Sequence, residues 1–294
     1  MNGKTLTSLL SLFLGVTAYA SVPRQGTVRF VPTALVPGAA ENLLSGSDWR
    51  EPLKKFAPTC TASVGTGGPS DPAAVARRMV VEKKSFAYWE TVVRGVKAGR
   101  TYLGGTWAKF KTANLCLWWQ GRPVGYKADE FYRIYSFSGF NASLERYLTA
   151  ATKERLAGDP NEWRLFYRTF KFSAPLTDEA CEVQYGFYDG AGDMTFAEPF
   201  LIDVTEAPRT MELEMKDVKP FKMLQVICLD LRDPMWTKEF DAPVTEFKMT
   251  LPETVDAFRN ADGGGVPGNM LIVKYVDGTE EHYASPAEGV MFAR

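Results

Sequence analysis

Histidine is nearly absent from this 294-residue sequence, in which His282 is the single copy. A Ser-His-Asp triad would have to use it, yet no G-x-S-x-G motif accompanies it. One histidine also excludes histidine-rich metal sites. We therefore interpret His282 as a surface residue with satisfied hydrogen bonds and not as a catalytic group.

An excess of charge of either sign is also lacking. The 34 basic and 35 acidic residues leave a net charge of −1. Neither nucleic acid nor an anionic membrane surface is implied as a partner. No stretch after residue 20 approaches the roughly 20 apolar residues that a membrane-spanning helix needs, so no membrane insertion is expected.

The first twenty residues have the pattern of a secretory signal peptide. Lys4 supplies the positive charge, 9–16 is an apolar run, and Ala18, Tyr19 and Ala20 form an A-x-A-like cleavage site. No cysteine lies near this point, so a lipid anchor is not expected. We expect a mature protein that begins at Ser21 and is secreted, periplasmic or at the cell surface.

Four cysteines remain after the signal, and none forms a C-x-x-C pair, which excludes a zinc ribbon. Their even number allows two disulfides in three connectivities. Each lies in a strand-like run, so buried free thiols are an equal alternative. The residues are Cys60, Cys116, Cys181 and Cys228.

Short strands dominate the rest of the chain. Residues 86–121 alternate, are rich in aromatic and β-branched side chains, and predict three consecutive strands. One helix is predicted over 143–156, with Gly158, Asp159 and Pro160 ending it. The fold class is therefore all-β: a jelly-roll β-sandwich with one inserted helix, followed by a smaller β-sandwich.

Domain boundaries follow from turn residues. We expect a signal peptide at 1–20, a linker or edge strand at 21–41, a jelly roll at 42–205 and a small β-sandwich at 206–294. The strand at 200–204 should pair beside 42–44 and close the jelly roll. The connection at Pro208 is short, which predicts a semi-rigid pair of domains. The residues expected to pack against the larger domain are Phe221, Met223 and Trp236.

The strands 101–110 and 115–119 carry the candidate ligand site. If 112–113 is a tight loop between them, the two tryptophans lie opposite one another on one face of the sheet. Paired aromatic rings stack on the apolar faces of sugar rings, and neighbouring polar groups bind the hydroxyls. The alternative is that this face is core, packed under the helix or the second domain. The predicted ligand-binding residues are Trp107, Trp118, Gln120 and Lys109.

Several motifs in 42–205 together resemble the jelly-roll carbohydrate-binding modules of families four, sixteen and twenty-two. These are Asn42-Leu43-Leu44 at the start, the run from Val96 to Tyr102 with Lys109 beyond it, the aromatic strand at 163–172, and the closing strand at 201–204. The closing strand has one Asp where the family usually has two. The resemblance implies glycan binding and often a structural calcium, with Asp203 as one ligand.

These observations predict an exported, non-catalytic protein that binds a polysaccharide or other glycan. Two alternatives stay open: a structural or adhesive protein that binds a protein partner, and a jelly-roll glycan hydrolase or lyase. The only cofactor implied is calcium. Residues 206–294 resemble no family known to us.

Overall fold

The computed structural model describes residues 25–36, 38–52, 58–110, 116–123, 136–138, 163–172, 176–228, 234–258 and 269–284. Its regular structure is β-strand apart from two single-turn 3₁₀ helices, η1 (Thr33–Leu35) and η2 (Thr177–Glu179). The all-β prediction is confirmed. The helix expected over 143–156 lies outside the described residues. In the described ranges no helix is long and apolar enough to cross a membrane.

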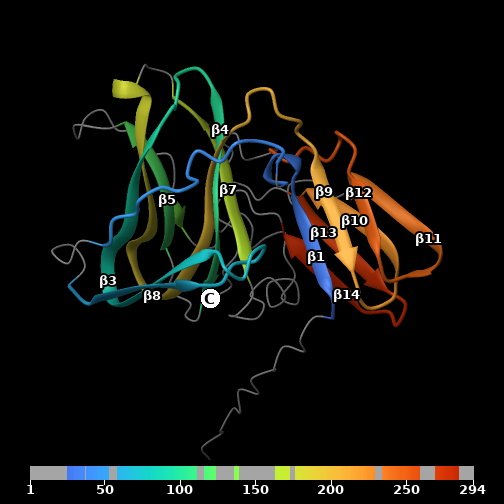
Figure 1. Ribbon diagram of the computed structural model, residues 1–294. Coiled ribbons are helices and arrows are strands. Elements are labelled where there is room, and N and C mark those ends of the chain that lie inside the picture. The colour runs from blue at the N-terminus through green and yellow to red at the C-terminus, as the bar shows by residue number, and fades with distance from the viewer. Residues whose placement is uncertain are drawn as a thin grey trace, which may run out of the picture.

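Seven strands form the larger sheet (Figure 1). Five of them are ordered β2-β3-β8-β4-β7, while β5 pairs with β8 and β6 pairs with β5. The strands are β2 (Cys60–Thr66), β3 (Val75–Arg94), β4 (Thr101–Phe110), β5 (Cys116–Pro123), β6 (Ser136–Ser138), β7 (Arg164–Lys171) and β8 (Ala180–Asp203).

This sheet folds over on itself, because β3 and β8 bend. Tyr185 and Phe196 lie in the two halves of β8, and an extended chain would separate them by about 35 Å. Their ring centroids are 4.7 Å apart. The paired strand β3 has register breaks on both sides of Ser85, where the bend requires them. The result is a sandwich of two layers joined by the long strands.

The first layer contains β5, β6 and the halves of β3 and β8 that pair around Trp89 and Tyr185. The second layer contains β2, β4, β7 and the other halves of β3 and β8. Buried side chains from both layers meet in the first core, including Met79, Trp89 and Phe196. Figure 1 shows this sandwich beside a second one.

The predicted hairpin between 101–110 and 115–119 is wrong. β4 pairs with β7 and with the later half of β8, whereas β5 pairs with the earlier half of β8 and with β6. The two strands therefore lie in different layers. Trp107 therefore lies opposite Leu165 and Ala197, and not opposite Trp118.

The smaller sandwich has a three-stranded and a four-stranded sheet. Their orders are β1-β9-β12 and β11-β10-β13-β14. β13 and β14 form an antiparallel pair on either side of Asp277 and Gly278, as the turn pair predicts. The strands are β1 (Thr27–Pro32), β9 (Met211–Lys216), β10 (Phe221–Cys228), β11 (Trp236–Val244), β12 (Phe247–Thr250), β13 (Asn269–Tyr275) and β14 (Glu280–Ala284).

Both ends of the chain build this smaller sandwich. β1 is antiparallel to β9, with Thr27 opposite Lys216 and Pro32 opposite Met211. β1 lies at the edge of the three-stranded sheet, so the N-terminal segment is a strand of the smaller sandwich. The larger sandwich is inserted between β1 and β9.

The predicted closure of the larger sandwich is confirmed. Asn42 forms an antiparallel bridge with Ile202, and the Leu43 N–H donates to the Leu201 carbonyl at 2.9 Å. The Asn42 side chain strengthens this junction. Its Oδ1 accepts from the N–H groups of Leu44 and Leu201, both at 3.0 Å. The segment before β2 is thereby fixed to the end of β8.

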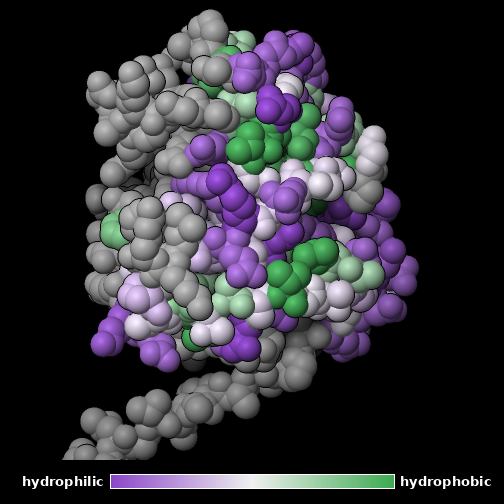
Figure 2. Space-filling model, turned by 60° about the vertical axis from the view of Figure 1, so that its left-hand side comes forward, coloured by the Kyte–Doolittle hydropathy of each residue, from purple (hydrophilic) through white to green (hydrophobic). Residues whose placement is uncertain are grey.

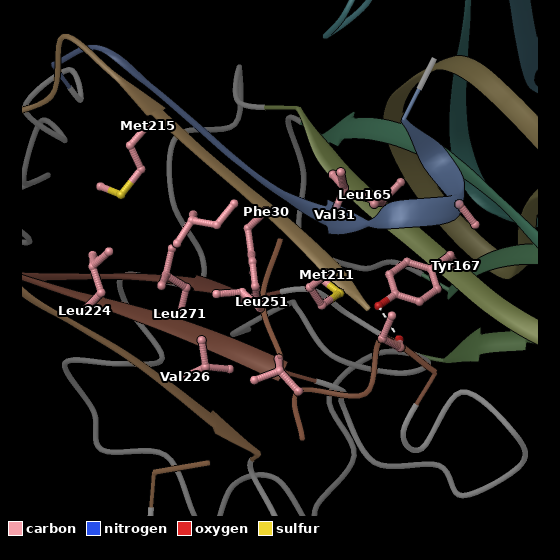
Figure 3. Packing of buried hydrophobic residues seen from close by; sticks show 14 of the residues in the cluster. Phe30, Val31, Leu165, Tyr167, Met211, Met215, Leu224, Val226, Leu251 and Leu271 are labelled. Atoms are coloured by element: carbon pink, nitrogen blue, oxygen red, sulfur yellow. Dashed lines mark hydrogen bonds between the residues drawn. The ribbon is translucent and has the colours of Figure 1, made fainter. Parts of the chain in front are cut away.

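A second core joins the two sandwiches (Figure 3). On the outer face of the second layer, Leu165 and Tyr167 point toward the smaller sandwich, where Met211 and Leu251 lie. The Tyr167 hydroxyl donates to the buried carbonyl of Ala257 at 2.9 Å. An apolar interface with a buried hydrogen bond holds two domains more firmly than the usual polar contact does.

The connection between the sandwiches is anchored at Arg209. Its guanidinium contacts both oxygens of Asp256, with an Nη2–Oδ2 distance of 2.9 Å, and its carbonyl accepts from the Ala257 N–H at 2.7 Å. The guanidinium carbon also lies 5.2 Å from the Phe258 ring centroid. The connection is therefore part of the structure of the smaller sandwich.

We expect trypsin to leave the native protein uncut after Arg209. In Asp256→Ala, cutting at Arg209 should become about two- to fivefold faster, because an exposed ion pair contributes up to ~1 kcal/mol. Mass spectrometry of a digestion time course measures this. Asp241→Ala, on the exposed face of β11, is the control and should match the wild type. Rapid release of two stable fragments from the wild type would contradict the rigid arrangement.

Candidate functional site

The outer face of the first layer brings polar and aromatic residues into register; we call it the β3–β8–β5 face. Across these strands Glu90 lies opposite Gln184, which lies opposite Gln120. One pleat away, Gly186 lies between Tyr88 and Trp118. Residues opposite one another in antiparallel strands share a face. The register therefore places two of the predicted site residues, Trp118 and Gln120, opposite β8 at Gly186 and Gln184.

Glu90 is held by contacts from two other residues. The Arg50 Nη2 lies 2.5 Å from its Oε1, and Gln184 donates to its Oε2. Arg50 also exchanges both backbone hydrogen bonds with Glu90, at 2.7 and 3.1 Å. The carboxylate is therefore held in one orientation, with 16% of its side chain exposed.

Gln184 carries a polar atom without a protein partner. The residue is fully buried, and its Oε1 accepts no hydrogen bond within the described part of the chain. An unsatisfied buried acceptor costs about 1–3 kcal/mol. The full burial of this residue keeps the acceptor out of reach of a ligand in solution.

Apolar side chains flank the polar row. Tyr88 is half-buried, while Phe86 and Val92 are 44% and 40% exposed. Figure 2 views the molecule with the β3 side turned forward; apolar surface there occurs in separate patches with hydrophilic surface between them. An alternation of apolar and polar surface suits a ligand that has both kinds of group.

Gly186 keeps the centre of the face flat. A Cβ at this position would lie 2.1 Å from the Ala87 carbonyl oxygen and 2.6 Å from the Tyr88 Cα. Strand β3 approaches β8 too closely here for any side chain. The space between Tyr88 and Trp118 is consequently left without a side chain of β8.

The other two predicted ligand residues lie in the second layer. Trp107 is half-buried and packs against the second core, which the smaller sandwich shares. Lys109 has its Nζ 4.8 Å from the ring centroid of Trp163. The alternative that this face of β4 is core holds for Trp107. A shared platform of Trp107 and Trp118 is not formed, because their strands belong to different layers.

A pocket of about 330 Å³ lies where β3 and β8 end and β4 begins. Arg100 and Asp203 form an ion pair there, with the Arg100 Nε 2.5 Å from Oδ2. The Thr205 N–H donates to Oδ1 at 3.0 Å. The lining residues are Glu41, Leu43, Gly95, Lys97, Arg100, Tyr102 and Asp203.

The surroundings of Asp203 do not suit calcium. Both carboxylate oxygens already accept hydrogen bonds, and a guanidinium occupies the position where a cation would bind. Within the described ranges no group of three acidic, cysteine or histidine side chains could hold a metal. Calcium needs six to eight oxygen ligands. The calcium prediction therefore gains no support from this residue's environment.

Burial raises the pKa of the Asp203 carboxyl, but hydrogen bonds from Arg100 and Thr205 outweigh it and hold the pKa below its ordinary value. The same hydrogen bond to Asp203 raises the pKa of Arg100. A carboxyl whose pKa is depressed on folding stabilises the protein above its unfolded pKa of about 4. This contribution is lost as the pH falls through the folded value.

Two of the four cysteines are described. Cys60 and Cys181 are free thiols, and burial raises their pKa values to about 11 and about 12, respectively. The side chains of Cys116 and Cys228 lie outside the described set.

His282 is buried and not on the surface, with Nε2 2.9 Å from Glu280 Oε1, so its predicted exposure is wrong.

No family model and no curated protein matches this chain. Among solved structures it is similar to a putative sugar binding protein from Bacteroides thetaiotaomicron, with 12% identity, 53% of this chain and 87% of that chain covered, and a TM-score of 0.36.

Two similar structures come from Paenibacillus barcinonensis Xyn10C. For its CBM22-1 xylan-binding domain the identity is 9%, the coverage is 63% of this chain and 100% of that chain, and the TM-score is 0.34. For its CBM22-1-CBM22-2 tandem domain the identity is 8%, the coverage is 92% of this chain and 99% of that chain, and the TM-score is 0.34. All three TM-scores are below 0.5. We therefore assign the architecture of this chain from its own strand order.

Gly186→Ala should lower the free energy of unfolding by about 1–3 kcal/mol, because the added methyl group meets backbone atoms of β3. Gly65→Ala is the matched control. That glycine lies in β2 with nothing within 4 Å of its Cβ position, so the change should be neutral or slightly stabilising. Urea unfolding of both variants measures this. Equal stabilities would show that the close approach of β3 and β8 is absent.

Asp203→Asn should destabilise the protein at pH 7 and destabilise it less at pH 3, because the stabilisation from the lowered Asp203 pKa is lost as the pH falls from the unfolded pKa of about 4 through the folded value. Urea midpoints at the two pH values measure the effect. Asp241→Asn, at an exposed position of β11, is the control. A deficit of the same size at both pH values would exclude the ion pair as its cause.

Proposed function

We propose that this protein binds a carbohydrate, without catalysis, on the β3–β8–β5 face. The observation that carries the proposal is the fixed row of Glu90 and Gln184 beside Tyr88 on one sheet face. Carbohydrates present hydroxyl groups around apolar ring faces, so a binding face needs oriented acceptors next to an aromatic surface.

Each part of the face has a role in this proposal. The exposed guanidinium of Arg50 donates to a sugar hydroxyl, and the buried side chain of Gln184 holds the Glu90 carboxylate in place. Tyr88 and Trp118 are the stacking candidates, because Gly186 between them holds no side chain against the sugar ring. Gln120, next to Gln184 in the register, extends the polar row.

The non-catalytic part of the proposal rests on how Glu90 is used. Hydrolysis needs one carboxyl as an acid and a second as a base or nucleophile. Both oxygens of Glu90 are engaged by Arg50 and Gln184, which suits orientation of the row better than proton transfer. The signal-like segment ending at Ala20 leads us to propose that binding takes place outside the cytoplasm.

Titration with a panel of soluble polysaccharides, followed by tryptophan fluorescence and calorimetry, tests the proposal. Trp118→Ala should weaken binding of the glycan that the wild type selects by about tenfold or more, since stacking contributes about 0.5–1.5 kcal/mol beyond the area it buries. Trp107→Ala is the matched control. It should lower the unfolding temperature, because Trp107 packs on the second core, and leave the affinity unchanged.

Other outcomes would overturn the proposal. Loss of binding in Trp107→Ala with full binding in Trp118→Ala would move the site to the second layer. Release of reducing sugar by the wild type would make the protein an enzyme. The absence of binding to every glycan, together with capture of a defined protein, would favour the adhesive alternative.

A further inference from the structure

The pocket between β3, β4 and the end of β8 is separate from the β3–β8–β5 face. One wall is the turn from Gly95 to Arg100, which connects β3 to β4, and the other wall is the segment that contains Glu41 and Leu43. Tyr102 is buried, while Glu41 and Lys97 are exposed. The pocket is open to solvent and carries charge of both signs.

Both walls are fixed before any ligand arrives. The Lys97 N–H donates to the Tyr102 hydroxyl at 2.7 Å, and the Gly99 N–H donates to the Phe172 carbonyl at 2.9 Å. On the opposite wall the Leu43 N–H donates to Leu201, as described above. A site whose walls are held by backbone hydrogen bonds loses little conformational freedom on binding.

The charges of the pocket divide into a paired and an unpaired set. Arg100 and Asp203 neutralise each other. Lys97 and Glu41 line the same pocket, and neither forms an ion pair within the described part of the chain. The Arg100–Asp203 contact uses Nε, so it leaves the terminal nitrogens of Arg100 for other acceptors.

We infer that this pocket binds a small zwitterion of the amino-acid class. The ligand's carboxylate contacts Lys97 and the terminal nitrogens of Arg100, its ammonium contacts Glu41, and its apolar part lies on Leu43. A ligand with one charge alone would satisfy Lys97 or Glu41 and leave the other charge facing it. The volume of about 330 Å³ is at the low end for ligand sites, roughly 300–1,000 Å³, which limits the ligand to a compact molecule.

Calorimetry of the full chain with L-leucine tests the inference, with D-glucuronate and D-glucosamine as ligands of single charge. L-leucine should bind at least about tenfold more tightly than either sugar, because one lost charge contact costs about 1.4 kcal/mol or more. Lys97→Gln and Glu41→Gln should each weaken leucine binding by about tenfold. The matched controls Lys222→Gln and Glu253→Gln, at exposed positions away from the pocket, should leave it unchanged.

The first result that would overturn the inference is no leucine binding at 10 mM, a concentration of about ten times a weak Kd of ~1 mM. The second is tighter binding of glucuronate than of leucine. The third is leucine binding that neither pocket variant weakens. Unfolding temperatures of the variants confirm that each is folded. The glycan titration is a separate measurement on a different face. Failure of one proposal therefore leaves the other intact.

Discussion

Burial on both faces of the part of the second layer formed by β4, β7 and the later half of β8 is the constraint on which the structure depends. Its inner face meets the first layer through Tyr102 and Phe196, and its outer face meets the smaller sandwich through Leu103 and Leu165. A sheet covered on both sides leaves no free surface for a ligand. It acts as the shared wall of two cores, and each sandwich is incomplete without it.

This arrangement determines where chemistry is accessible. The smaller sandwich covers β4 and β7, whereas β2 at the edge of the second layer is exposed, and so are Phe86 and Val92 on the outer face of the first layer. The two polar sets lie on the first layer and at the strand ends, away from the covered part of the second layer. On the first layer, Glu90 and Gln184 hold each other across neighbouring strands. At the strand ends, Arg100 and Asp203 link the start of β4 to the end of β8. In both places an exposed basic side chain lies at the internal pair, Arg50 in one and Lys97 in the other.

The sequence was informative where structure is local. Alternation predicted the strands around 86–121 and 180–188, and the turn residues predicted the β13–β14 hairpin. The closing contact of Asn42 with Ile202 was anticipated from the motifs. The separate partners of β4 and β5 were not anticipated. Adjacency along the chain favours a hairpin, whereas these two strands lie in different layers. Glu90 and Gln184 lie far apart in the sequence, and nothing local indicates that β3 and β8 place them side by side. Trp107 was predicted to bind a ligand but packs against the second core for the same reason. Periodicity identifies the face on which a residue lies but not what covers that face.

The position of β1 has a consequence for how the chain folds. Translation produces β1 first, but its partner β9 follows only after the whole larger sandwich has been made. Closing so long a loop in an unfolded chain carries an entropy cost that grows with loop length. The bridge between Asn42 and Ile202 reduces this cost, because a folded larger sandwich already brings its two ends together. The order of assembly is therefore encoded in the topology: the inserted unit folds first, and the chain's beginning joins its later strands last.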